Sequence, residues 1–184
     1  DAWALHSALR GLNAARTLLV VSSKTFTTQE TMTNAASAQR WLKDQGCPED
    51  ALSTHLVAIT ASPKQSAKLG FPAERTFLFW DWVGGRYSVW SSVGLSLQIA
   101  LGADVWSRFL KGAAEMDVHF RDTPLDSNVP AKLAMLDVFR HSGKDNAPTR
   151  TVLAYAHRLR KLPDFLQQLE MESNGKNVSD APGG

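Results

Sequence analysis

Three short apolar runs that alternate with helical segments constrain the fold of this chain more than any other feature of its sequence. The runs are "RTLLVVSS", "THLVAIT" and "RTFLFW", which begin at Arg16, Thr54 and Arg75. The first two have the continuous apolar character of strands that are buried on both faces. Strands that are separated by helices favour a parallel sheet, because a parallel connection requires a crossover. The sequence therefore predicts an α/β fold over about its first hundred residues.

Helical segments between and after these strands complete the outline. Apolar spacing and terminal glycines predict three helices in the first part of the chain, over residues 2–12, 28–45 and 62–70. In the second part we expect four helices, over residues 87–101, 105–120, 128–141 and 164–174, and a strand over 151–156. No further complete strand–helix–strand unit follows. We therefore expect part of one layered domain (1–101), a helical linker (102–136) and the start of a second domain (137–184).

Composition and charge exclude several classes of protein. The 184 residues are 43% hydrophobic and 21% charged, which is typical of a globular protein. A formal net charge of +2 does not indicate a nucleic-acid partner. No apolar stretch approaches the roughly 20 residues that span a bilayer, so no membrane partner is expected either. The single cysteine, Cys47, has no partner for a disulfide within the chain, which fits a reducing cytoplasm.

The histidines do not predict a metal site. They lie on different predicted elements, without the spacing of metal ligands: His6, His55, His119, His141 and His157. The serines at 88, 91 and 92 do not form the Gly-x-Ser-x-Gly pattern of a hydrolase. We therefore expect neither a metal site nor the nucleophilic serine of such a hydrolase.

The first stretch that could carry chemistry is "SSKTFTTQET", residues 22–31, where a predicted strand ends and a helix begins. Ligands of parallel sheets bind at the carboxyl ends of the strands, and a helix N-terminus offers free N–H groups and the positive end of its dipole. Four residues add hydroxyls and one cation: Ser23, Lys24, Thr25 and Thr28. They form a candidate phosphate-binding loop without the glycine-rich run of a Walker loop. The alternative is that a threonine only caps the helix.

The second stretch is "DWVGGR", residues 81–86, which follows the third predicted strand. Gly84 and Gly85 permit a tight turn and a close approach of the backbone. Arg86 would then project into a cleft at the same sheet edge as the first stretch, where it suits an anion or a charge that develops in a reaction. The alternative is that Arg86 pairs with Asp81 and that the glycines only turn the chain.

The third stretch is "FLQQLEMESNGK", residues 165–176. Gln168, Glu172 and Lys176 recur every four residues, so they share one face of a continuous helix. A carboxylate with an amide one turn earlier can serve as a positioned general base. The alternative is a solvated helix end that Asn174 and Gly175 cap.

Taken together, the three stretches resemble the phosphoglucose isomerase family. "SKTFTTQETMTNA", "FWDWVGGRYSVWSSVGLS" and "LQQLEMESNGK" are similar to the most recognisable motifs of that family and follow in the same order. The resemblance covers Thr17 to Lys176. It implies two domains of the sugar isomerase (SIS) type, each a three-layer αβα sandwich around a parallel sheet. This chain would hold the latter part of the first domain and the start of the second.

The resemblance also implies roles for individual residues. Those expected to hold the phosphate of the sugar are Ser23, Lys24, Thr25 and Thr28. Glu172 matches the base that moves a proton between C2 and C1 of the open-chain sugar, Arg86 matches the arginine that stabilises the enediolate, and Gln168 lines the pocket. The implied activity is the isomerisation of glucose 6-phosphate and fructose 6-phosphate, in glycolysis and gluconeogenesis, without a cofactor.

The resemblance places other parts of that active site outside this sequence. The glycine-rich strand loop of the family would precede Ala2, and the histidine and lysine of its ring-opening step would follow the last residue. In the family that histidine comes from the neighbouring subunit, which implies a homodimeric parent protein. We therefore expect a fragment with little or no activity alone. The alternative is a non-catalytic sugar-phosphate-binding module of the same fold, which would not need Glu172.

Overall fold

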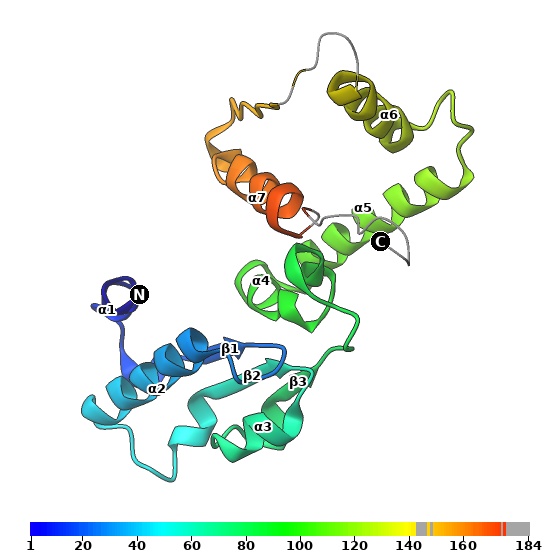
Figure 1. The fold of residues 1–184 in the computed structure, drawn as a ribbon. Coiled ribbons are helices and arrows are strands. Elements are labelled where there is room, and N and C mark those ends of the chain that lie inside the picture. Colours follow the sequence, from blue (N-terminus) through cyan, green and yellow to red (C-terminus); the bar gives the residue numbers. More distant parts are fainter. Residues whose placement is uncertain (143–146, 148, 174, 176–184) are drawn as a thin grey trace, which may run out of the picture. The chain divides into compact units, whose positions relative to one another are not determined.

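The structure, a computed structural model, describes residues 1–142, 147, 149–173 and 175 (Figure 1). The chain divides into two compact units, Asp1–Ser96 and Leu97–Gly184. In the described part of the chain, no helix has both the length and the hydropathy that a membrane-spanning segment needs.

A parallel sheet organises the first unit, as predicted (Figure 1). Its strands are β1 (Leu19–Ser22), β2 (Leu56–Thr60) and β3 (Thr76–Leu78), and β2 lies in the centre. In the register, Val20 faces Val57 and Ile59 faces Phe77. The three carboxyl ends therefore lie at one edge of the sheet, which is where the first two candidate stretches begin.

Burial differs among the three strands. All five residues of β2 are buried, but β1 is only half-buried, which corrects the prediction that it is buried on both faces. In β3, Phe77 and Leu78 are 42% and 57% exposed. The reason is position in the sheet: within the described residues β1 and β3 pair on one side only, whereas β2 is flanked on both sides.

Helices α1 (Ala2–Leu9), α2 (Gln29–Asp44) and α3 (Pro63–Lys68) confirm the three helices predicted for the first part of the chain. The glycines predicted to end α2 and α3 both have positive φ, as a helix C-terminus favours: Gly46 and Gly70. The core beside the sheet contains Phe26, Leu42, Leu52, Leu56, Ala58 and Phe71. A fully buried leucine of this kind stabilises the fold by about 1.5–3 kcal/mol.

The continuous helix predicted over residues 87–101 is wrong. The structure has a 3₁₀ helix at Gly85–Trp90, a second at Ser92–Gly94, and then α4 (Leu95–Leu101). The break lies at Ser91, whose backbone is extended and whose Oγ donates to the Ser88 carbonyl oxygen at 2.6 Å. Serine hydroxyls that bond to nearby backbone groups compete with the hydrogen bonds of a helix. Three serines in five residues therefore interrupt the apolar segment.

The second unit contains α5 (Ala103–Asp122), α6 (Val129–Ser142) and α7 (Leu162–Gln168), which correspond to three of the predicted helices. A π-helical turn, Leu169–Ser173, continues directly from α7. The strand predicted over residues 151–156 is absent from the described structure, because the described part of this unit offers no strand for it to pair with. Tyr155 in this segment is 95% exposed.

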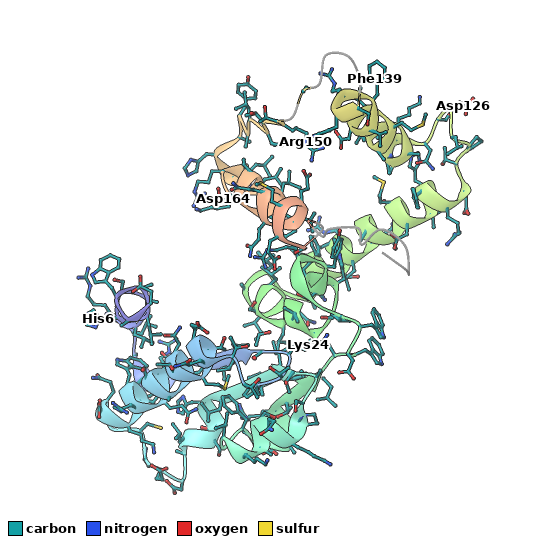
Figure 2. All side chains as sticks on the ribbon, in the orientation of Figure 1. His6, Lys24, Asp126, Phe139, Arg150 and Asp164 are labelled. Atoms are coloured by element: carbon teal, nitrogen blue, oxygen red, sulfur yellow. The ribbon has the colours of Figure 1, made fainter. Side chains whose placement is uncertain are left out.

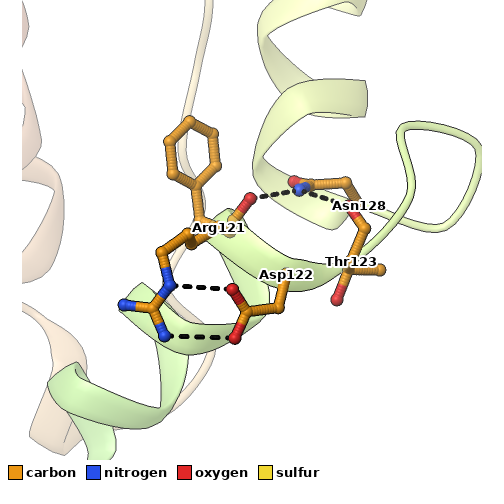
Figure 3. A network of polar contacts seen from close by, with 5 residues as sticks. Arg121, Asp122, Thr123 and Asn128 are labelled. Atoms are coloured by element: carbon orange, nitrogen blue, oxygen red, sulfur yellow. Dashed lines mark hydrogen bonds and ion pairs between the residues drawn. The ribbon is translucent and has the colours of Figure 1, made fainter.

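Asn128 fixes the turn between α5 and α6, and Asp126 of this turn is labelled in Figure 2. Its Nδ2 donates to the carbonyl oxygens of Phe120 at 2.7 Å and Thr123 at 3.3 Å (Figure 3). Its Oδ1 accepts from the N–H of Ala131 at 3.1 Å. This side chain, which is 2% exposed, therefore pairs backbone groups at the end of one helix and at the start of the next.

Candidate functional site

The loop that follows β1 is anchored to the central strand. The N–H of Ser23 donates to the carbonyl oxygen of Ile59 at 3.0 Å, which extends the ladder beyond the end of β1. The Ser23 hydroxyl, which is almost fully buried, accepts from the N–H of Phe26 at 3.2 Å. Ser23 therefore shapes the loop from inside.

Phe26 holds the middle of the loop in the core. It is 3% exposed, and its ring meets the ring of Phe71 edge to face at 5.2 Å. Its φ is +54°, a left-handed conformation that costs a residue with a side chain on the order of 1–2 kcal/mol. Burial of the ring offsets that cost, and the polar residues on either side remain exposed. Among them, the hydroxyls of Thr25 and Thr27 lie 2.7 Å apart in a hydrogen bond.

Lys24 joins the first candidate stretch to the second (Figure 2). Its carbonyl oxygen accepts from the N–H of Ala61 at 3.0 Å and from the hydroxyl of Thr60 at 2.9 Å, which fixes its backbone. Its ammonium donates to the carbonyl oxygen of Asp81 and lies 4.0 Å from the position of a Cβ at Gly84. The structure thus brings the two loops together at the carboxyl edge of the sheet, as predicted.

Thr28 precedes α2 as its N-cap residue, but its hydroxyl makes no capping hydrogen bond with the described first turn of the helix. Thr25 and Thr27 bond to each other instead. The alternative reading, in which a threonine side chain caps the helix, therefore does not hold. The positive end of α2 lies beside the exposed hydroxyls, although Glu30 in the first turn weakens its attraction for an anion.

The second loop turns where the glycines were predicted to allow it. Gly85 has φ +58°, in the left-handed region that favours glycine, and it begins the 3₁₀ helix that carries Arg86. The Ser92 hydroxyl donates to the Leu78 carbonyl oxygen at 3.1 Å, which ties the end of this segment to β3. Arg86 is half-buried, and within the described residues it forms no ion pair with Asp81. The alternative pairing is thus wrong.

The third stretch spans α7 and the π-helical turn. Gln168 is the last residue of α7, and Glu172 lies in the π-helical turn, where the Ser173 hydroxyl donates to its Oε2 at 2.7 Å. Helical structure therefore continues from Gln168 to Glu172, as predicted. Turns of π-helix are rare and occur often at functional sites. Asn174, which was considered as a helix cap, and Lys176, which was predicted to share a face with Gln168 and Glu172, lie outside the described residues.

The predicted residues divide between the two units. The first unit holds Ser23, Lys24, Thr25, Thr28 and Arg86, and the second holds Gln168 and Glu172. Within the described residues, no group of three or more histidine, cysteine, aspartate or glutamate side chains could hold a metal ion.

A cavity of about 900 Å³ lies elsewhere in the first unit, between α1 and α2. His6, Glu30, Asn34 and Trp41 are among its lining residues, but none of the seven predicted residues lines it. Sequence reasoning did not find this cavity, because a space between two amphipathic helices leaves no residue-type signal. Its lining also includes Arg10, Thr33 and Ser37, but it lies apart from the two loops at the carboxyl edge of the sheet.

Sequence reasoning also did not assign a role to Arg150. This residue lies in the second unit and forms ion pairs with Asp137 of α6 and with Glu170 of the π-helical turn. A lone arginine in an irregular segment carries no motif, so only the three-dimensional arrangement reveals it.

Comparisons with known proteins identify relatives along nearly the whole chain. A profile of the phosphoglucose isomerase family matches residues 1–183. The glucose-6-phosphate isomerase of Saccharophagus degradans is 44% identical over 97% of this chain and 32% of its own length, and that of a Ruegeria species is 50% identical over 95% and 32%. A crystal structure of a glucose-6-phosphate isomerase from Chlamydia trachomatis superposes with a TM-score of 0.84 at 33% identity, over 97% of this chain and 34% of that one. The chain spans about a third of the length of these relatives.

Proposed function

Because this chain belongs to the phosphoglucose isomerase family, we propose that it forms part of a glucose-6-phosphate isomerase. The observation that carries the proposal is the family match over residues 1–183. The structure also matches a solved isomerase over 97% of the chain, which supports the SIS-type α/β fold. The three candidate stretches supply side chains for phosphate binding, proton transfer and charge stabilisation.

The first step of the proposed function is phosphate binding by the loop between β1 and α2. Thr25 and Thr28 offer exposed hydroxyls, and the first turn of α2 offers N–H groups at the positive end of its dipole. Lys24 adds a positive charge that is already positioned by its bond to the Asp81 carbonyl oxygen, and an ammonium retains two further donors. Ser23 shapes the loop through its bond to Phe26.

The second step is proton transfer by Glu172. The carboxylate removes the proton from C2 of the open-chain aldose, the C–H electron pair forms the C1–C2 double bond, and the carbonyl electrons move to O1. Glu172 then returns the proton to C1 while the C2 hydroxyl becomes the carbonyl and its proton moves to O1. All electrons stay within the sugar, so the reaction balances without a redox cofactor. Gln168, at the end of α7, would line the pocket around these carbons.

Arg86 would stabilise the enediolate that forms between the two transfers. A cation that is held where negative charge develops lowers the barrier, because the interaction is stronger in the transition state than in the ground state. Arg86 is half-buried, and within the described residues it forms no ion pair with Asp81. Its guanidinium is therefore available to stabilise the enediolate. We further propose that the parent protein is a cytoplasmic homodimer of glycolysis and gluconeogenesis.

The variant Glu172→Gln in the full-length enzyme tests this function. We expect kcat for fructose 6-phosphate to fall by about two to four orders of magnitude, because an amide cannot accept the proton, while the Kd of the sugar phosphate stays within about twofold. Turnover is measured by a coupled assay and binding by calorimetry. Glu49→Gln, at an exposed carboxylate that pairs with Lys43, serves as the matched control and should change neither value.

Two outcomes would contradict the proposal. A parallel loss of binding and turnover in Glu172→Gln would show a structural role for the carboxylate. Sugar-phosphate binding by an unmodified full-length protein that has no turnover would favour the non-catalytic binding module instead.

A further inference from the structure

Arg150, which is labelled in Figure 2, bridges two carboxylates from different elements of the second unit. Its Nη1 lies 2.7 Å from Oδ2 of Asp137 on α6. Its Nη2 forms an ion pair with Oε1 of Glu170, in the π-helical turn. The planar guanidinium presents its donors in a fixed fork, so it can hold both carboxylates at once in a defined geometry.

Glu170 stands two residues before the proposed base. Both Glu170 and Glu172 belong to the π-helical turn Leu169–Ser173. This turn has only five residues, and π-helical hydrogen bonds rarely continue beyond a single turn. Its direction therefore depends on contacts outside the turn. α6 has 14 residues and provides a longer and more regular support.

We propose that Arg150 is a positioning residue for Glu172. By tying Glu170 to Asp137, it links the π-helical turn to α6 and thereby fixes the direction of the Glu172 carboxylate. This inference rests on the proposed function, because it assumes that Glu172 is the base. Arg150 itself would not contact the sugar.

Loss of Arg150 should change the position of the Glu172 carboxylate more than it changes the free energy of unfolding. The three side chains are 42–43% exposed, and exposed ion pairs contribute little to the stability of a fold. A reacting group that is displaced by about 1 Å, however, can lower turnover by about a hundredfold. Loss of Arg150 should therefore reduce kcat much more than it reduces the stability of the fold.

The test uses Arg150→Met, Glu170→Gln and the double variant in the full-length enzyme. We expect Arg150→Met to lower kcat by about ten- to a hundredfold, with KM for fructose 6-phosphate within about twofold. Glu170→Gln should have a similar effect, and the double variant should be no worse than the worse single variant, because both changes break the same link. Arg158→Met is the matched control, since Arg158 has no ion pair within the described residues, and should retain kcat.

Asp137→Asn provides an independent variant that keeps the shape of the side chain. It leaves Arg150 and Glu170 in place but weakens the support from α6, so kcat should fall again at constant KM. An unchanged kcat in Arg150→Met, additive effects in the double variant, or a rise in KM without a fall in kcat would overturn the inference.

The same set of proteins separates this inference from the proposed function. If Glu172→Gln is inactive and Arg150→Met is fully active, only the positioning role fails. If Glu172→Gln keeps full turnover, the proposed function fails, and the positioning role fails with it.

Discussion

At the scale of single residues, Lys24 connects the two candidate loops of the first unit through its hydrogen bonds. Its backbone is bonded to Thr60 and Ala61, and its ammonium is bonded to the carbonyl oxygen of Asp81. One side chain therefore places a positive charge at the candidate phosphate-binding loop and also holds the loop that carries Arg86. Its removal should affect both functions together.

We expect Lys24→Met in the full-length enzyme to lower kcat/KM for fructose 6-phosphate by about ten- to a hundredfold. The reason is that a lost hydrogen bond to a charged group corresponds to about 1.5–3 kcal/mol. Steady-state kinetics measures this effect. Lys43→Met removes an equivalent charge from an exposed ion pair with Glu49 and should leave kcat/KM unchanged. Equal kinetics for the two variants would show that Lys24 has neither role.

Only part of this arrangement could be predicted from the residues. The glycines and Arg86 marked the second loop because glycine has a distinct backbone freedom, and Gly85 indeed has positive φ. The acceptor for Lys24 left no such mark, since every residue has a carbonyl oxygen and Asp81 lies 57 positions away. The same holds for Arg150, whose two partners are recognised only after the chain has folded.

At the scale of elements, Asn128 links α5 to α6 through direct hydrogen bonds, whereas the apolar pattern of either helix specifies no such link. It bonds to two carbonyl oxygens at the end of α5 and to one N–H at the start of α6. His119 adds a second link, because its Nε2 accepts from the N–H of Val129 at 3.2 Å. The turn is therefore built mainly from polar contacts with the backbone.

We expect Asn128→Ala to raise the exchange rate of backbone amides at both helix ends, because a buried group that loses its partner costs about 1–3 kcal/mol. Hydrogen–deuterium exchange of the full-length protein measures the change. Asn128→Asp is the matched control: its carboxylate can still accept from Ala131, so α6 should stay protected while the end of α5 loses protection. Equal protection in all three proteins would exclude this capping role.

The sequence predicted those elements whose apolar pattern is regular. The alternation of strands and helices was sufficient for the parallel sheet, and amphipathic spacing was sufficient for α5. The pattern was misleading at residues 87–101, because apolar content does not show that Ser88 and Ser91 bond to local carbonyl oxygens. It was misleading again at residues 151–156, because strand-like composition does not supply a partner strand.

At the scale of the whole molecule, the combination of motifs is more informative than any single one. Each of the three stretches had a structural alternative when it was considered alone. Their common order resembles one family, and the family match over residues 1–183 confirms that assignment. The structure refutes two of the alternatives, the threonine cap and the Arg86–Asp81 pair. The roles of the seven residues and the domain boundaries at 101 and 136 stay predictions, and the proposed variants test the roles.

The chain of 184 residues, produced by itself, should show no measurable isomerisation of fructose 6-phosphate. It spans about a third of its relatives, and the resemblance assigns a phosphate-site loop and the ring-opening residues to other segments.

We also expect the chain of 184 residues to self-associate, because Trp80 and Trp82 stack at 5.4 Å while 67% and 79% exposed, next to the exposed end of β3. Light scattering during size-exclusion chromatography measures the association, and a coupled assay measures the isomerisation. Trp80→Ser combined with Trp82→Ser should shift the chain toward the monomer, whereas Trp3→Ser, at a separate exposed tryptophan, should not. Turnover close to that of the full-length enzyme would contradict the first expectation, and a monomeric unmodified chain would contradict the second.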